Sequence, residues 1–169
     1  MINDDFSKIE YSKLSSLEKY ILTQVYDFDL RFRDYIKSYN FHKIYVELLN
    51  FCTLDLSAFY FDIKKDILYC DSEISQRRNH CLEVLNVLIN FLLKWFSPIL
   101  AFTTEEAYQV IKNKNYKSIH LQDFSVIPSI WNNSEIKNKW IEIKKVKQVV
   151  NAAIEDIRNK KIKIGRAHV

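Results

Sequence analysis

Glycine is nearly absent from this chain, which has a single one, Gly165, among its 169 residues. Glycine allows the positive φ angles of tight turns and lets backbone amides approach a phosphate closely. Neither a G-x-G-x-x-G loop nor a G-x-x-x-x-G-K-[S/T] loop can be written from this sequence, which excludes both nucleotide-binding loops. Proline is also scarce, with two residues, and so few turn formers fit long helices better than many short strands.

Metal-binding patterns are missing as well. The cysteines Cys52, Cys70 and Cys81 form no C-x-x-C pair, and the four histidines form no H-x-x-x-H or H-E-x-x-H pair. We therefore expect buried or incidental thiols in a reducing cytoplasm and no zinc site.

No segment reads as a signal or a membrane span. Residues 1–6 have neither a basic stretch nor an apolar core, so no signal peptide is expected. Residues 84–100 are the most apolar run, but Asn86, Lys94 and Pro98 interrupt it, which favours a buried helix.

The net charge is only +4, with acids towards the start and lysines towards the end. A basic stripe suits phosphate binding, and a solvated helix face is the alternative.

Hydrophobic residues, by contrast, are plentiful and recur at helical spacing. They make up 48% of the chain, enough for a core at this length. A capping box of Ser15 and Glu18 is expected to start the first helix. The spacing predicts helices over residues 15–39, 41–52, 56–64 after a break near 54–56, 75–96, 103–111 after a second capping box at 103–106, and 134–160. Residues 113–131 read as an irregular connection. These elements predict an all-α bundle of about five helices.

The polar residues include no clear catalytic set. Glu105 and Glu106 read as first-turn acids that complement a helix dipole. Two aspartates, Asp62 and Asp66, are spaced to form an ion-pair cluster with Lys64 and Lys65.

Two arginines are the best candidates for RNA contact on charge alone. Arg77 and Arg78 fall in the first turn of the helix over residues 75–96, where cations oppose the helix dipole and a phosphate would offset that cost. The alternative is that Arg77 and Arg78 are simply exposed to solvent.

Arg31 and Arg33 lie among aromatics of the first helix. Trp131 falls in the irregular connection, where we expect it to be exposed and able to stack on an unpaired base.

Several segments resemble one enzyme family, in the same order. Residues 55–71 read DLSAFYFDIKKDILYCD, and this run resembles the C-terminal anticodon-binding domain of bacterial isoleucyl-tRNA synthetases. Valyl and leucyl enzymes share the bundle but not this run, which therefore carries the isoleucine assignment. Further similar stretches are residues 17–22, 39–45, 50–60, 95–107 and 118–124. Tyr108, directly after the fourth of these stretches, stands where the family usually has tryptophan.

The resemblance implies an all-α bundle of the class I aminoacyl-tRNA synthetase anticodon-binding type. It implies that the chain binds the anticodon arm of isoleucine tRNA within an enzyme that charges this tRNA using ATP. The family's HIGH and KMSKS motifs and its editing insertion are absent here, so no catalytic residue, cofactor site or metal site is carried over. ATP with magnesium, and any zinc, would bind elsewhere in the full enzyme. The implied partners are isoleucine tRNA and the catalytic domain of the same chain; we expect a cytoplasmic monomer with no membrane contact.

Charge and aromatic character then select the tRNA-binding candidates. They are Arg31, Arg33, Lys64, Lys65, Arg77, Arg78 and Trp131.

We expect a helical bundle over residues 1–125 and a connection with a truncated C-terminal helix over 126–165. Residues 166–169 read as an artefactual tail, because Ile-Gly-Arg-Ala-His-Val also matches a translated sequencing adapter. The alternatives are a stand-alone helical RNA-binding or adaptor module, the equivalent domain of a valyl or leucyl enzyme, and a purely structural bundle.

Overall fold

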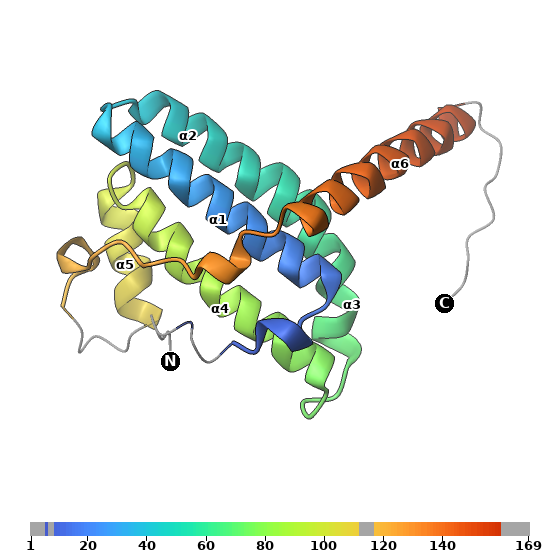
Figure 1. Cartoon of the computed structure of the whole chain (residues 1–169), viewed down its shortest axis with the longest axis horizontal. Coiled ribbons are helices and arrows are strands. Elements are labelled where there is room, and N and C mark those ends of the chain that lie inside the picture. The colour runs from blue at the N-terminus through green and yellow to red at the C-terminus, as the bar shows by residue number, and fades with distance from the viewer. Residues whose placement is uncertain (1–5, 7–8, 112–116, 160–169) are drawn as a thin grey trace. The chain divides into compact units, whose positions relative to one another are not determined.

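The computed structural model of the chain describes residues 6, 9–111 and 117–159, and over these residues it is helical with no strand. With residues 41–70 counted as one uninterrupted run, the described residues contain five long helical runs, which confirms the all-α expectation. The expected tail at 166–169 lies outside the described residues. The elements (Figure 1) are η2 (Tyr11–Lys13), α1 (Ser16–Lys37), α2 (Phe41–Asn50), the π-helix η3 (Phe51–Phe61), α3 (Asp62–Cys70), α4 (Gln76–Phe96), α5 (Ala101–Ile111), η4 (Ile119–Leu121), η5 (Ser129–Trp131) and α6 (Ser134–Asn159).

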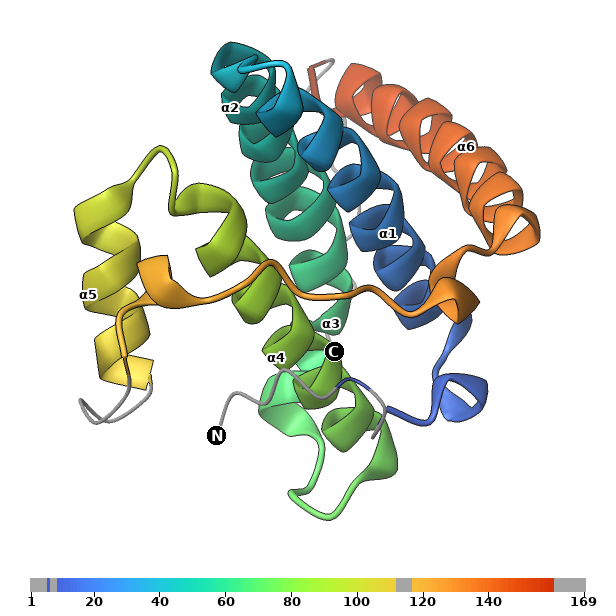
Figure 2. The ribbon, with the colours of Figure 1, turned by 60° about the vertical axis from the view of Figure 1, so that its left-hand side comes forward.

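The chain divides into two compact units, Met1–Asn132 and Asn133–Val169. In the first unit α1 packs against α2 and α4, and α4 packs against α3 and α5. The segment over residues 117–131, called the return segment below, runs from α5 back across the bundle to α1 (Figures 1 and 2). The second unit is built on α6, in which no residue is buried.

Helix α1 starts and packs as its sequence predicts. The Ser15 side chain accepts from the Glu18 amide, and the Glu18 carboxylate accepts from the Ser15 amide at 2.8 Å, which confirms the expected capping box. A stripe at three- and four-residue spacing is buried to 2% exposure or less, and consists of Ile21, Val25, Phe28 and Phe32. Tyr39 follows in the left-handed region at φ 54°, a position where a chain so poor in glycine must use another residue.

The predicted helix break near residues 54–56 is wrong. The helix runs without interruption from Phe41 to Cys70, and its middle is the π-helix η3. No proline or glycine lies in this stretch to force a break. The wider i→i+5 hydrogen bonding of a π-helix instead adjusts which residues face inward. Leu56, Phe59 and Tyr60 are consequently buried at 5% exposure or less.

The same run, Phe41–Cys70, is long and apolar enough to cross a membrane by length and composition alone. It is a different segment from the one over residues 84–100 that the sequence singled out as most apolar. Core helices of bundles pass the same test, and one third of its most apolar window is buried inside the bundle.

The second predicted capping box is also wrong. Helix α5 already begins at Ala101, so Thr103 lies inside it, and the Thr104 hydroxyl donates to the Leu100 carbonyl at 2.9 Å. The chain turns tightly after Pro98, with the Leu100 amide donating to the Phe96 carbonyl at 2.7 Å, and this starts the helix early. Glu105 therefore lies beyond the first turn, and its role is described below.

Candidate functional site

Arg77 and Arg78 lie in the first turn of α4, as predicted, but their surroundings differ. The Ser75 hydroxyl caps the helix by accepting from the Arg78 amide and donates to Asp71 at 2.9 Å. The Arg78 Nε donates to the Leu68 carbonyl at 3.2 Å, at the negative end of α3, which offsets the unfavourable dipole of α4. Arg77 is exposed and makes no ion pair or hydrogen bond with the residues that the structure describes.

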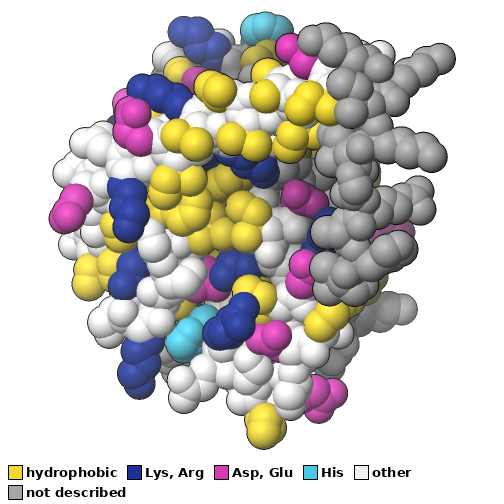
Figure 3. All heavy atoms as spheres, turned by 90° about the vertical axis from the view of Figure 1, so that its right-hand side faces the viewer, with side chains coloured by type: hydrophobic (Ala, Val, Ile, Leu, Met, Phe, Trp, Pro, Cys, Tyr) yellow, Lys and Arg dark blue, Asp and Glu magenta, His cyan; other side chains and the backbone are white. Residues whose placement is uncertain are grey.

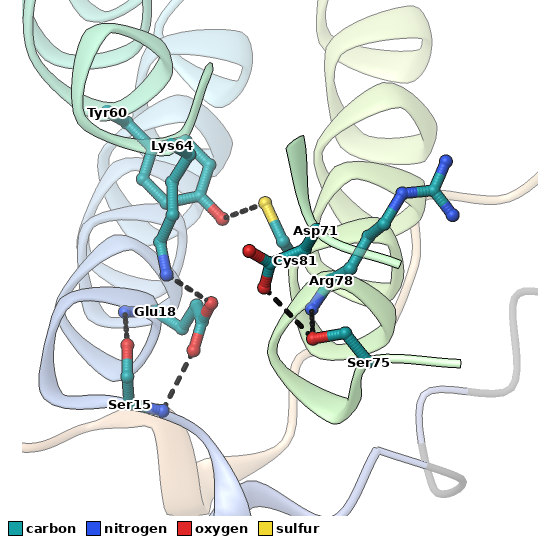
Figure 4. Close-up of polar contacts among 8 residues, drawn as sticks. All are labelled: Ser15, Glu18, Tyr60, Lys64, Asp71, Ser75, Arg78 and Cys81. Carbon is teal, nitrogen blue, oxygen red and sulfur yellow. Dashed lines mark hydrogen bonds and ion pairs between the residues drawn. The ribbon is translucent and has the colours of Figure 1, made fainter. Parts of the chain in front are cut away.

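Lys64 is a buried residue rather than a surface cation. Its exposed fraction is 5%, and its Nζ donates to Glu18 Oε1 at 2.5 Å (Figure 4). Burial alone would raise the pKa of Glu18, but the hydrogen bonds from Lys64 and Ser15 and the charge of Lys64 outweigh burial and lower this pKa. The pair joins the start of α1 to α3, so Lys64 stabilises the bundle.

The expected ion-pair cluster around Lys64 forms only in part. Lys65, not Lys64, pairs with Asp62 at 2.9 Å, and both side chains are about half exposed. One residue step along a helix turns the side chain by about 100°, so neighbouring lysines face core and solvent respectively.

Beside the buried pair, the Tyr60 hydroxyl contacts the Cys81 sulfur at 3.7 Å (Figure 4), and burial raises the pKa of Cys81. The Cys81 thiol is therefore an unreactive side chain that fills space in the core.

Arg31 links α1 to α2. Its Nε donates to Glu47 at 2.9 Å, and its guanidinium lies 5.8 Å from the ring centre of Phe28. Glu47 also accepts from the Tyr35 hydroxyl at 2.6 Å. Burial would raise the pKa of Glu47, but the hydrogen bonds from Tyr35 and Arg31 and the nearby cations lower it. Arg31 remains about half exposed.

Arg33 fastens the return segment to the bundle. Its Nε donates to Asp29 at 2.6 Å and its Nη2 donates to the Ser125 carbonyl at 2.8 Å. Asp29 is buried and also accepts from the Trp95 indole N–H at 2.9 Å. The buried Lys94 ammonium donates to the Ser125 hydroxyl at 2.7 Å. These residues form one network, which we call the Ser125 anchor.

Trp131 is buried, which corrects the expectation that it is exposed. Its exposed fraction is 1%, and its ring packs 5.8 Å from Phe6 and 6.3 Å from Phe91, centre to centre. A segment without helical periodicity can still bury a large ring, because the return segment closes over α1 and α4. Trp131 therefore cannot stack on an RNA base while the bundle keeps this packing.

Two of the clefts in the first unit are lined by residues that the structure describes. The α1–α2 cleft, about 170 Å³, contains one cation and two carboxylates among its lining residues, which are Gln24, Phe28, Arg31, Glu47, Asn50, Phe51 and Asp55. The second, which we call the η4 cleft, is about 220 Å³ and has no carboxylate in its lining of Lys94, Ser97, Pro98, Ile119, His120, Gln122 and Phe124. The η4 cleft was missed by sequence reasoning, although Lys94 interrupting an apolar run was a signal for it.

On the face drawn in Figure 3, Lys and Arg side chains lie among hydrophobic and acidic ones. In the described part of the chain, no group of three His, Cys, Asp or Glu side chains could hold a metal ion.

Comparison with known proteins shows which family this sequence matches. Residues 18–167 match the family model described as the anticodon-binding domain of tRNA ligase. An isoleucine–tRNA ligase of Pelagibacter ubique is 50% identical over 165 residues, which is 95% of this chain and 18% of the relative. Those of Agrobacterium fabrum and Bartonella quintana are 40% and 37% identical, over 95% and 92% of this chain and 16% of each relative. The chain spans about a sixth of the length of these curated relatives.

Proposed function

The chain belongs to the family of anticodon-binding domains of tRNA ligases, and from this premise we propose that it binds the anticodon arm of isoleucine tRNA as part of an isoleucine–tRNA ligase. The observation that carries the proposal is the 50% identity to such a ligase over 165 residues. The whole enzyme would charge isoleucine tRNA with L-isoleucine using ATP, and this part would dock the tRNA so that its acceptor end reaches a distant active site.

The remaining assignments follow from that role. We propose residues 1–125 as the RNA-binding bundle and residues 126–165 as the connection and helix that lead onward. The partners would be isoleucine tRNA and the catalytic domain of the same full-length chain, in a cytoplasmic monomer. ATP with magnesium, and any zinc, would bind to parts of the enzyme outside this chain.

For the RNA contact itself, exposure favours some of the candidate cations over others. Arg77 faces solvent without a described partner, and Arg78 beside it is half-buried with its Nε on Leu68. Lys65 and Arg31 are also partly exposed, each in an ion pair. We propose Arg77 and Arg78 as the main phosphate contacts, with Lys65 and Arg31 secondary. Lys64, Arg33 and Trp131 would support binding only by holding the bundle together.

The salt dependence of tRNA binding tests this assignment. Each lost phosphate contact lowers the slope of log affinity against log salt by about 1. Replacing Arg77→Gln and Arg78→Gln together should weaken binding of isoleucine tRNA and lower the slope by about 2. The control, Lys13→Gln with Lys37→Gln, removes the same charge from other exposed positions. An equal loss in the control, or unchanged affinity at moderate salt, would contradict the assignment.

The genomic locus distinguishes a ligase part from a detached module. In-frame HIGH and KMSKS motifs upstream of this reading frame would support the ligase. A stop codon directly before Met1, with a complete synthetase elsewhere in the genome, would support a stand-alone RNA-binding module instead.

A further inference from the structure

The η4 cleft lies at the opposite end of α4 from the two arginines. From Arg78 to Lys94 is 16 residues, or roughly 24 Å of helix at 1.5 Å per residue. Its volume is about 220 Å³. That is room for one planar ring system and not for a folded partner.

Its walls are held in place from two sides. Glu105 of α5 accepts from the Ser118 hydroxyl at 2.7 Å and from the Ile119 amide at 2.9 Å. The hydrogen bond from Gln109, together with those from Ser118 and Ile119, lowers the pKa of Glu105, so it stays an acceptor at neutral pH. Ile119 is buried in a small core with Leu93 and Tyr108.

The other wall is fixed by the Ser125 anchor, in which Arg33 and Lys94 both hold Ser125. Gln122 and Phe124, which line the cleft, therefore stand on a segment pinned at residues 118–119 and again at 125. A cleft built this way needs little ordering when a ligand enters, which favours binding.

The chemistry of the lining selects a nucleobase. The Phe124 ring packs against Phe32 at 5.2 Å in an edge-on arrangement and is still 36% exposed. The Gln122 amide can both donate and accept, as a base edge requires. No carboxylate in the lining would repel a phosphate, and its lysine, Lys94, is buried and holds Ser125. Proteins commonly bind an unpaired nucleotide by stacking its base on an aromatic ring and hydrogen-bonding the base edge, and Phe124 and Gln122 offer these two groups.

We propose that the η4 cleft takes one unpaired base of the bound RNA, stacked on Phe124 and hydrogen-bonded at its edge by Gln122. This inference rests on the proposed tRNA-binding function and adds to it a second contact, separate from Arg77 and Arg78. The α1–α2 cleft is the competing location, but Glu47 and Asp55 in its lining oppose the approach of an anionic chain.

The test uses isoleucine tRNA carrying 2-aminopurine at one unpaired anticodon-loop position at a time. Phe124→Leu keeps apolar bulk against Phe32 but removes the stacking face. It should weaken tRNA binding about 5-fold or more. It should also restore the 2-aminopurine fluorescence that stacking on Phe124 quenches at one labelled position. Gln122→Ala should weaken binding at the same position. Phe102→Leu, at a ring that is 93% exposed, is the matched aromatic control and should change neither. Circular dichroism confirms that each variant folds.

Each outcome decides one claim. If the unchanged chain binds the tRNA and Phe124→Leu binds equally well, the cleft assignment is overturned and the proposed function stands. Weakening by Asn50→Ala in place of Phe124→Leu would move the base to the α1–α2 cleft and also overturn it. If the unchanged chain binds no tRNA even at low salt, the proposed function fails and this inference fails with it.

Discussion

At the N-terminal end of α4 the Arg77 side chain is exposed and pairs with no described residue, whereas at the C-terminal end the Lys94 ammonium is buried and donates to Ser125. Both cations belong to one helix. The first is exposed at the surface, where we propose a phosphate contact, and the second holds the return segment to the bundle. Positive charge in this chain therefore occurs in two settings, and burial separates them where residue type does not. Lys64 and Lys65 repeat the contrast one residue apart.

The largest expected effect comes from breaking the buried ion pair. Lys64→Met leaves Glu18 charged and without its partner in the core, and we expect a loss of about 3–5 kcal/mol in the free energy of unfolding. Lys65→Met, on the solvent side, should change it by no more than about 0.5 kcal/mol. Urea denaturation of both variants measures the difference, and similar losses would erase the distinction between inner and outer cations.

A double variant sharpens that result. Glu18→Gln with Lys64→Met removes both charges together, so no buried charge is left unpaired. We expect most of the lost stability to return relative to Lys64→Met alone, because a buried pair is often no better than a neutral replacement of similar volume.

The next effect concerns the Ser125 anchor. Asp29→Ala removes the acceptor of both the Trp95 indole and Arg33. We expect a loss of about 2–3 kcal/mol, while Asp34→Ala, at an exposed position on the same helix, should lose about 0.5 kcal/mol or less. Thermal unfolding followed by tryptophan fluorescence measures both. A tolerant Asp29→Ala variant would mean that Arg33 and Lys94 hold Ser125 without help from Asp29.

Acid should reveal the buried pair through the depressed pKa of Glu18. The folded-state pKa of Glu18 lies below the unfolded value of about 4.5, so the unfolded chain binds more protons between the two pKa values. The contribution of Glu18 is present above the unfolded pKa and is lost as pH falls through the folded pKa. The stability gap between the unchanged chain and Glu18→Gln should shrink over that window. A gap that stays constant from pH 7 to pH 3 would disagree with this.

The smallest effects compare the neighbouring arginines. Arg78→Met gives up the hydrogen bond to Leu68 and should cost about 1 kcal/mol. Arg77→Met removes an exposed cation from the positive end of a helix and should be neutral or slightly stabilising. Denaturant midpoints resolve the two, and equal changes would show that the Leu68 contact contributes nothing.

Local features of this bundle could be read from the sequence, and distant ones could not. The Ser15–Glu18 capping box and the start of α4 at Ser75 depend on residues within one turn, so both were predicted. The partner of Lys64 is 46 residues away, and the partner of Arg33 on the return segment is 92 residues away. Spacing patterns contain no information about such contacts, so the sequence offered the nearer Asp62 and Asp66 instead.

Two other errors concern segments without regular α-helical geometry. They are the break near residues 54–56 and the exposed Trp131. Period can be lost because the backbone widens into a π-helix, as in η3, or because an irregular segment is packed over a core, as at Trp131. The η4 cleft needed the fold itself, since α4 and the return segment meet there only in three dimensions.

The most direct test of the central claim is the choice among tRNAs. We would measure the affinity of this chain for isoleucine tRNA, for valine tRNA, and for isoleucine tRNA with the valine anticodon, all at one salt concentration. The account predicts tightest binding to isoleucine tRNA and a loss of affinity when only its anticodon is exchanged. Equal affinity for all three would contradict it, and would leave a helical bundle that attracts RNA only through its charge.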